Sequence, residues 1–159
     1  MKIRRAREED YDAVAAFTED TWADRDGGDY IPEVFLDWVE NQDEEQRTLV
    51  AVEDGTPIGL VQAVLLSEYE AWFQGMRVDP DHRNEGVGRS LSNASFDWAS
   101  DRGATVGRNM VFGWNVQGLG LSRAAGYEPE TEFRWAHPEP DGDAEPDATV
   151  RSDVNAAWS

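Results

Sequence analysis

Residues 72–102 read WFQGMRVDPDHRNEGVGRSLSNASFDWASDR, which is the layout of a strand, a tight polar loop and a helix. The apolar start of this stretch ends at Asp79, and the proline that follows stops strand pairing because it lacks an N–H and has a fixed φ. From Val87 onward, apolar and small residues recur on one helical face, and Gly103 stands where such a helix ends. The sequence therefore predicts a strand that passes through a loop directly into an amphipathic helix.

The loop itself, residues 83–88, has the sequence Arg-Asn-Glu-Gly-Val-Gly. Its two glycines let the backbone come close to a ligand. The first turn of the following helix has N–H groups without partners inside the helix, and these carry a partial positive charge. Arg83 and Arg89 are available to pair with an anion. Together these features predict a cradle for phosphate groups.

The pattern Arg-x-x-Gly-x-Gly after a strand that ends in Val-Asp-Pro resembles the acetyl-coenzyme A loop of the GNAT N-acetyltransferases. The resemblance covers about residues 2–136. It implies the α/β GNAT acyl-CoA N-acyltransferase fold, a mixed central sheet of about six to seven strands with helices on both faces. We expect the acetyltransferase domain to span residues 1–137. Residues 138–159 form an acidic, proline-rich tail, which we expect to be either mobile or docked as a last strand.

A second segment, Asn115 to Tyr127, resembles the family motif Asn-x-x-Ala-x-x-Leu-Tyr-x-x-x-Gly-Phe. Asn115 and Tyr127 match it, and Asn115 is also a good N-cap for a short helix. Gly118 and Ser122 depart from it. The family's usual tyrosine can protonate the departing thiolate, whereas a serine is a poorer acid that can still donate a hydrogen bond.

Apolar and alternating runs elsewhere predict the remaining elements of the fold. Strands are expected at residues 2–6, 47–53, 57–66, 105–112 and 131–135. Helices are expected after the acidic residues 8–10, from Pro32 and after Asn115.

The resemblance implies direct transfer of an acetyl group from acetyl-CoA to a primary amine of a small molecule or peptide. The residues implied to bind the cofactor are Met76, Arg77, Val78, Arg83, Asn84, Glu85, Gly86, Val87, Gly88, Arg89 and Asn115. The reaction also needs a base, a donor for the developing oxyanion and orientation of both substrates.

The base is not fixed by the sequence. The family member with a glutamate on the central strand has it at the position of Trp72. By alternation, Glu70 and Glu68 lie on the same side of the strand as Trp72, Gln74, Met76 and Val78. Either glutamate can act directly or through water, or simply form a solvated acidic strand end. We take Glu70 and Ser122 as the candidate catalytic residues. A different reading, a non-catalytic acyl-CoA sensor or partner-binding module, is favoured by Trp72 and Ser122.

Charge excludes one class of function. The chain of 159 residues has 14 lysines and arginines against 33 aspartates and glutamates, a net charge of −19, so its surface repels nucleic acid. Only Lys2 is a lysine, a composition that predicts a salt-adapted cytoplasmic protein. An ordinary acidic protein is the alternative.

Other partners are constrained by what the chain lacks. It has no cysteine, which excludes disulfides and thiolate metal sites, and its two histidines, His82 and His137, show no metal-ligand spacing. Its longest apolar run, within residues 59–66, is far shorter than the roughly 20 residues that span a bilayer. We therefore expect no metal, membrane or nucleic-acid partner, and a homodimer stays open.

Overall fold

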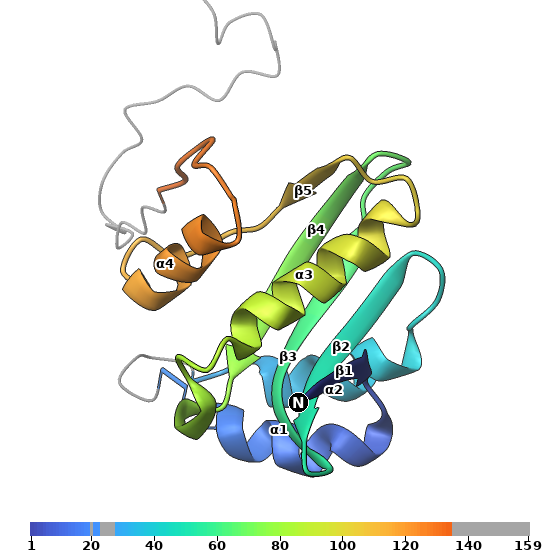
Figure 1. Ribbon diagram of the computed structural model, residues 1–159, viewed down its shortest axis with the longest axis vertical. Helices are drawn as coiled ribbons and strands as arrows, with labels where there is room; N and C mark the ends of the chain where they lie inside the picture. Colours follow the sequence, from blue (N-terminus) through green and yellow to red (C-terminus); the bar gives the residue numbers. More distant parts are fainter. Residues whose placement is uncertain (20, 23–27, 135–159) are drawn as a thin grey trace, which may run out of the picture. The chain divides into compact units, whose positions relative to one another are not determined.

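The computed structural model describes residues 1–19, 21–22 and 28–134 (Figure 1). Its contacts divide the chain into two units, residues 1–128 and 129–159. The expected domain boundary after residue 137 lies outside the described residues. Residues 131–134 are not a strand, so that part of the predicted last strand is wrong. Alternation alone does not make a strand, because a strand also needs a neighbour that accepts its hydrogen bonds.

Five strands in the described part of residues 1–128 form one sheet in the order β1-β2-β3-β4-β5. They are β1 (Lys2–Arg5), β2 (Gln46–Glu53), β3 (Thr56–Leu65), β4 (Glu70–Val78) and β5 (Val106–Arg108). The first four strands pair antiparallel, and β5 pairs parallel with β4. The predicted mixed sheet is confirmed, with five strands in the described residues where six to seven were expected.

Helices cover both faces of this sheet, as predicted (Figure 1). They are α1 (Tyr11–Thr18), α2 (Ile31–Glu40), α3 (Val87–Ser100) and α4 (Val116–Ala124), with short 3-10 turns η1 (Glu8–Asp10) and η2 (Pro80–His82). On one face, Phe35 of α2 packs in a cluster with Leu60 of β3. On the other face, Leu91 of α3 packs in a cluster with the next residue along β3, Val61. Neighbouring residues point to opposite sides of a strand, so the two clusters form two core layers.

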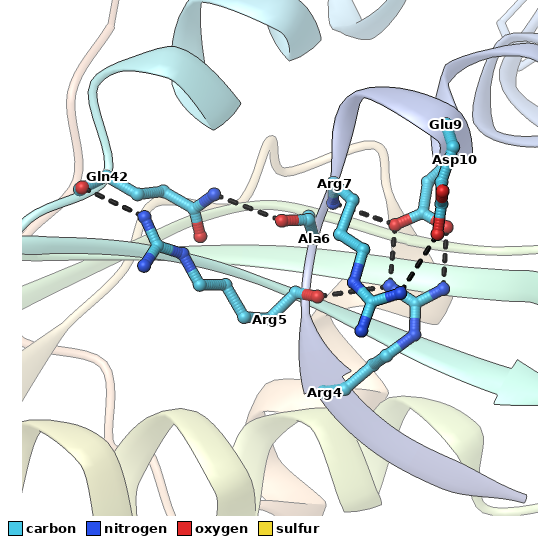
Figure 2. Close-up of polar contacts among 7 residues, drawn as sticks. All are labelled: Arg4, Arg5, Ala6, Arg7, Glu9, Asp10 and Gln42. Atoms are coloured by element: carbon cyan, nitrogen blue, oxygen red, sulfur yellow. Dashed lines mark hydrogen bonds and ion pairs between the residues drawn. The ribbon is translucent and has the colours of Figure 1, made fainter.

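Arginine side chains hold the beginning of the chain in place (Figure 2). Arg4 donates to both carboxylate oxygens of Asp10, each at 2.7 Å, and the backbone N–H of Arg7 donates to the same carboxylate at 2.9 Å. Arg5 donates to the carbonyl of Gln42 at 3.0 Å. Burial opposes ionisation of Asp10, but these hydrogen bonds and the charge of Arg4 hold the pKa of its carboxyl below the usual value. This network fixes β1 to the turn that starts the helical layer.

A bulge interrupts β4 at Gly75. The register of β4 against β3 shifts between Leu60 and Gln62, and Gly75 has φ = +66°. A Cβ atom at this position would lie 2.6 Å from the ring of Trp38. Only glycine fits both the left-handed backbone and the close approach of the indole.

The bulge changes which side chains share a face. Phe73, before the bulge, packs with α3 residues, and so do Met76 and Val78 after it. The prediction that Met76 and Val78 share a face with Glu70 is therefore wrong, because one extra residue reverses the alternation.

Candidate functional site

The predicted phosphate cradle begins at Gly86, the N-cap of α3. Gly86 has φ = +85° and ψ = +6°, and no side chain caps the helix. The N–H groups of the first turn are thus left for another acceptor. A Cβ atom built on Gly86 would meet nothing within 4 Å, so open space lies beside this backbone. Asn84 also has a positive φ, +66°, which completes the tight turn of the loop.

The second glycine of the loop has a different role. A Cβ atom at Gly88 would lie 2.9 Å from the side chain of Leu121 on α4. Gly88 therefore allows α3 and α4 to approach closely, and Val87 beside it is buried in the core. The sequence had assigned both glycines to ligand approach, but the geometry leaves only Gly86 facing open space.

The two arginines of the cradle also differ. Arg89 donates to the carbonyl of Ala124 at 3.1 Å and so ties α3 to the end of α4. Arg83 makes one long hydrogen bond, from Nε to the carbonyl of Val78 at 3.4 Å, and has no carboxylate partner in the described part of the chain. Arg83 is thus the arginine with a guanidinium free to meet an anion. Glu85 approaches His82, at 3.3 Å.

Strand β4 is open along half of one edge. The register pairs Glu70–Trp72 with Val106–Arg108, and within the described residues no strand pairs with β4 on that side beyond Trp72. The predicted strand at residues 105–112 is therefore much shorter, with its C-terminal part leaving β4. This separation leaves residues 76–78, the segment implied to bind the pantetheine arm, without a strand partner on that side. The carbonyls of Met76 and Val78 accept hydrogen bonds from the side chains of Arg77 and Arg83.

The side chain of Arg77 is occupied by contacts within the protein. It makes a buried, bidentate ion pair with Asp29, with Nε–Oδ2 at 2.7 Å and Nη2–Oδ1 at 3.0 Å. Its guanidinium lies 4.2 Å from the ring centre of Trp22. Arg77 could therefore contact the cofactor only through its backbone atoms.

The second motif starts with a cap. The side-chain oxygen of Asn115 accepts a hydrogen bond from the N–H of Gly118 at 2.9 Å. A Cβ atom at Gly118 would lie 2.6 Å from Nδ2 of the same asparagine. Gly118, which stands where the family motif has an alanine, thus leaves room for the Asn115 side chain to cap the helix. A cofactor contact by Asn115 stays a prediction.

Ser122 lies on α4, and its hydroxyl oxygen accepts a hydrogen bond from the side chain of Asn109 at 3.0 Å. Because the oxygen is the acceptor, the hydroxyl hydrogen remains able to donate elsewhere. Asn109, immediately after β5, was missed at the level of sequence. Its only signal was its place within the strand predicted at residues 105–112.

The candidate base, Glu70, forms an ion pair with Arg108 of β5. Trp72 donates through Nε1 to the side chain of Gln74 at 3.1 Å, and Gln74 donates to Gln62 at 2.6 Å. Glu68 lies before the strand, which begins at Glu70. The structure assigns no role in proton transfer to these groups, so the catalytic residues stay predictions.

These features agree with a comparison of the sequence with known families. Residues 6–126 match the model of the acetyltransferase (GNAT) family. The chain belongs to this family. Among the helices that the structure describes, none is long and apolar enough to cross a membrane.

Individual relatives support the same family. The chain is 36% identical to streptothricin acetyltransferase of Streptomyces lavendulae over 74 residues, which is 43% of this chain and 37% of that protein. The chain thus spans little more than a third of this curated relative.

Solved structures are similar in fold. The PaiA N-acetyltransferase of Thermoplasma acidophilum, in complex with coenzyme A, superimposes with a TM-score of 0.74 at 18% identity, covering 83% of this chain and 92% of that one. An aminoglycoside 6'-N-acetyltransferase of Acinetobacter haemolyticus has a TM-score of 0.70 at 19% identity, covering 89% of this chain and 100% of that one.

Proposed function

We propose that the protein transfers the acetyl group of acetyl-CoA to a primary amine. The observation that carries this proposal is the open edge of β4 together with the uncapped N-terminus of α3, the next α-helix along the chain. An acyl-pantetheine arm can bond to the free strand edge while its diphosphate meets the helix N–H groups. Few other ligands combine an extended amide chain with a diphosphate.

The residues of the loop fit the diphosphate of the cofactor. Gly86 offers open space where any larger residue would place a side chain, and Arg83 has a guanidinium without a carboxylate partner. The backbone of residues 83–89 would hold the phosphates, and that of residues 76–78 would hold the pantetheine amides. Asn115 would contribute from the start of α4.

The proposed chemistry is a direct attack without a covalent enzyme intermediate. The amine nitrogen forms a bond to the thioester carbonyl carbon, the carbon–sulfur bond breaks, and coenzyme A leaves as a thiolate. Glu70 would take the proton from the amine through water, since its carboxylate is already held by Arg108. Ser122 would donate its free hydroxyl hydrogen to the departing sulfur.

The acceptor we propose is a cationic small-molecule amine, with a peptide amine as the second candidate. The net charge of −19 attracts cations. Among the similar proteins, one is named a streptothricin acetyltransferase, and one solved structure is an aminoglycoside acetyltransferase bound to sisomicin. These names concern the relatives and guide the choice of the first compounds to test.

The test is acetyl-CoA turnover, measured as free thiol release, against aminoglycosides, streptothricin, polyamines and basic peptides. We expect thiol release with at least one of them, together with a product heavier by one acetyl group. Cofactor binding without thiol release across the whole panel would support the alternative of a non-catalytic acyl-CoA sensor. Trp72, at the position of the family glutamate, and Ser122, at that of the tyrosine, favour that alternative.

A further inference from the structure

One imidazole and two carboxylates meet beside the cofactor loop. Glu53 ends β2, His82 ends the η2 turn, and Glu85 lies in the loop that leads to α3. One ligand atom from each of the three residues lies within 4.8 Å of the other two. None of these side chains belongs to the hydrophobic core, and all three are open to solvent.

Both carboxylates approach the same nitrogen. Nδ1 of His82 lies 3.3 Å from Oε2 of Glu85 and 3.6 Å from Oε2 of Glu53. A single N–H on this nitrogen can point at one oxygen only, and 3.6 Å is too long for a hydrogen bond. A hydrogen bond therefore accounts for the approach of Glu85 only, while Glu53 lies within ion-pair distance of the same nitrogen.

The same distances suit the edges of a metal polyhedron. Zinc binds nitrogen and oxygen at about 2.0–2.1 Å, so two ligands of a tetrahedral site lie about 3.3–3.4 Å apart. The spacing of His82 from Glu85 matches this edge, and that from Glu53 exceeds it by a few tenths of an ångström. The other oxygen of Glu53 lies 3.6 Å from the N-terminal amine, which leaves Oε2 for the ion.

Although the sequence predicts no metal partner, we propose that Glu53, His82 and Glu85, which only the fold brings together, bind a divalent first-row transition metal such as Zn²⁺. His82 provides Nδ1, each glutamate provides one oxygen, and solvent completes the coordination. The imidazole favours these metals over calcium and magnesium, which prefer oxygen ligands. The two carboxylates balance the charge of the ion.

Such an ion would tie two segments that are distant in sequence. Glu53 stands at the β2–β3 turn, whereas Glu85 directly precedes Gly86 at the start of α3. Bound metal would hold the loop against the sheet and order the backbone that the proposed diphosphate meets. The site itself does not depend on the proposed acetyl transfer.

The experiment uses the tag-free protein and titrates Zn²⁺ alone by calorimetry, followed by Co²⁺ with visible absorption. We expect one ion per chain, an absorption of low-coordinate Co²⁺ and a higher melting temperature with Zn²⁺. Glu53→Gln and His82→Gln should each weaken Zn²⁺ binding by about tenfold or more, because each removes a ligand. Circular dichroism of the metal-free variants checks that both still fold.

The matched control is His137→Gln, which removes the only other histidine of the chain. It should leave the affinity for Zn²⁺ unchanged, and Ca²⁺ should not displace the bound Zn²⁺. Equal affinity in the wild type and in the folded His82→Gln protein would overturn the proposal. So would loss of binding in the His137→Gln protein, or the absence of saturable Zn²⁺ binding.

Discussion

Arginines at two places in this acidic protein are used in opposite ways. At the start of the chain, Arg4 donates two hydrogen bonds to the carboxylate of the buried Asp10, and Arg7 pairs with Glu9 (Figure 2). In the loop before α3, Arg83 has one long hydrogen bond to a carbonyl and no carboxylate partner in the described residues. Each of these arginines carries the same charge, but the chain supplies a carboxylate for Arg4 and Arg7 and none, within the described residues, for Arg83.

This difference separates a structural site from a binding site. An arginine whose donors are all met by the protein adds stability and has nothing left for a ligand. An arginine that lies beside uncapped helix N–H groups and has no carboxylate partner can still pair with an external anion. Loss of the buried Asp10 should therefore destabilise the fold, and changes at the loop should weaken binding.

The largest effect is expected where the open loop is blocked. Gly86→Val should remove detectable acetyl-CoA binding, because a side chain would fill the space beside the backbone and valine resists a positive φ. Calorimetry with acetyl-CoA measures this. Gly55→Val is the matched control, since Gly55 has φ = +90° and open space beside it but lies in the β2–β3 turn, outside the glycine loop. Unchanged affinity in Gly86→Val, or equal loss in Gly55→Val, would contradict the assignment of the loop.

The next effect concerns stability. Asp10→Asn leaves Arg4 without its counter-charge and should cost about 3–5 kcal/mol of unfolding free energy, measured by urea denaturation. Glu9→Gln, the control, disrupts an exposed pair and should cost about 0–1 kcal/mol. Similar losses in both variants would remove the distinction between buried and exposed pairs.

The same pair predicts a pH dependence with a definite sign. The pKa of Asp10 is held below its usual value, so its stabilisation is present above the unfolded carboxyl pKa of about 3.9 and is lost as the pH falls through the lower folded pKa. The difference in stability between the wild type and Asp10→Asn should therefore shrink below about pH 4. A difference that grows with acidity would show that another group controls this range.

A smaller effect is expected from the unpaired arginine. Arg83→Ala should weaken acetyl-CoA binding by about 1.5–3 kcal/mol, the value of a hydrogen bond to a charged group. Arg102→Ala serves as control, because Arg102 lies at the other end of α3 and pairs with Glu44. If both variants bind equally well, Arg83 does not contact the phosphates.

The smallest effect is expected at Ser122. Coenzyme A leaves as a thiolate whose conjugate acid has a pKa near about 8.5, so protonation before departure is not required near neutral pH. Ser122→Ala should lower kcat by about tenfold or less, because one ordinary hydrogen bond lowers the activation free energy by about 0.5–1.5 kcal/mol. Ser122→Tyr, which restores the family residue, should raise kcat if the ring fits. A thousandfold loss in the alanine variant, with cofactor affinity intact, would make the serine an essential catalytic group.

Much of the fold was predictable because local patterns and long-range packing agree. The strand, loop and helix of residues 72–102 and the cap at Asn115 follow from alternation, glycine and capping residues. The helix layers on both faces of the sheet follow from the resemblance to the family. The family followed from the same segments. The salt-adapted surface suggested by the net charge stays a prediction.

The bulge at Gly75 could not be predicted in this way. A strand pattern gives a period of two, but one inserted residue depends on the partner strand and on the indole of Trp38 lying against the backbone. The early end of β5 is a similar case, because pairing requires two strands and the sequence of one does not show where the other leaves.

The sequence by itself determined which residue types surround the candidate site: glycines for a left-handed turn, arginines for an anion and an asparagine for a helix cap. The tertiary structure alone decided which of them are available. Gly88 meets Leu121, Arg89 holds α4 and Arg77 is buried against Asp29, whereas Gly86 and Arg83 remain open. The reason is physical. The type of a residue determines which ligands its side chain can bind, but contacts with distant segments decide whether that side chain is already occupied by the protein itself.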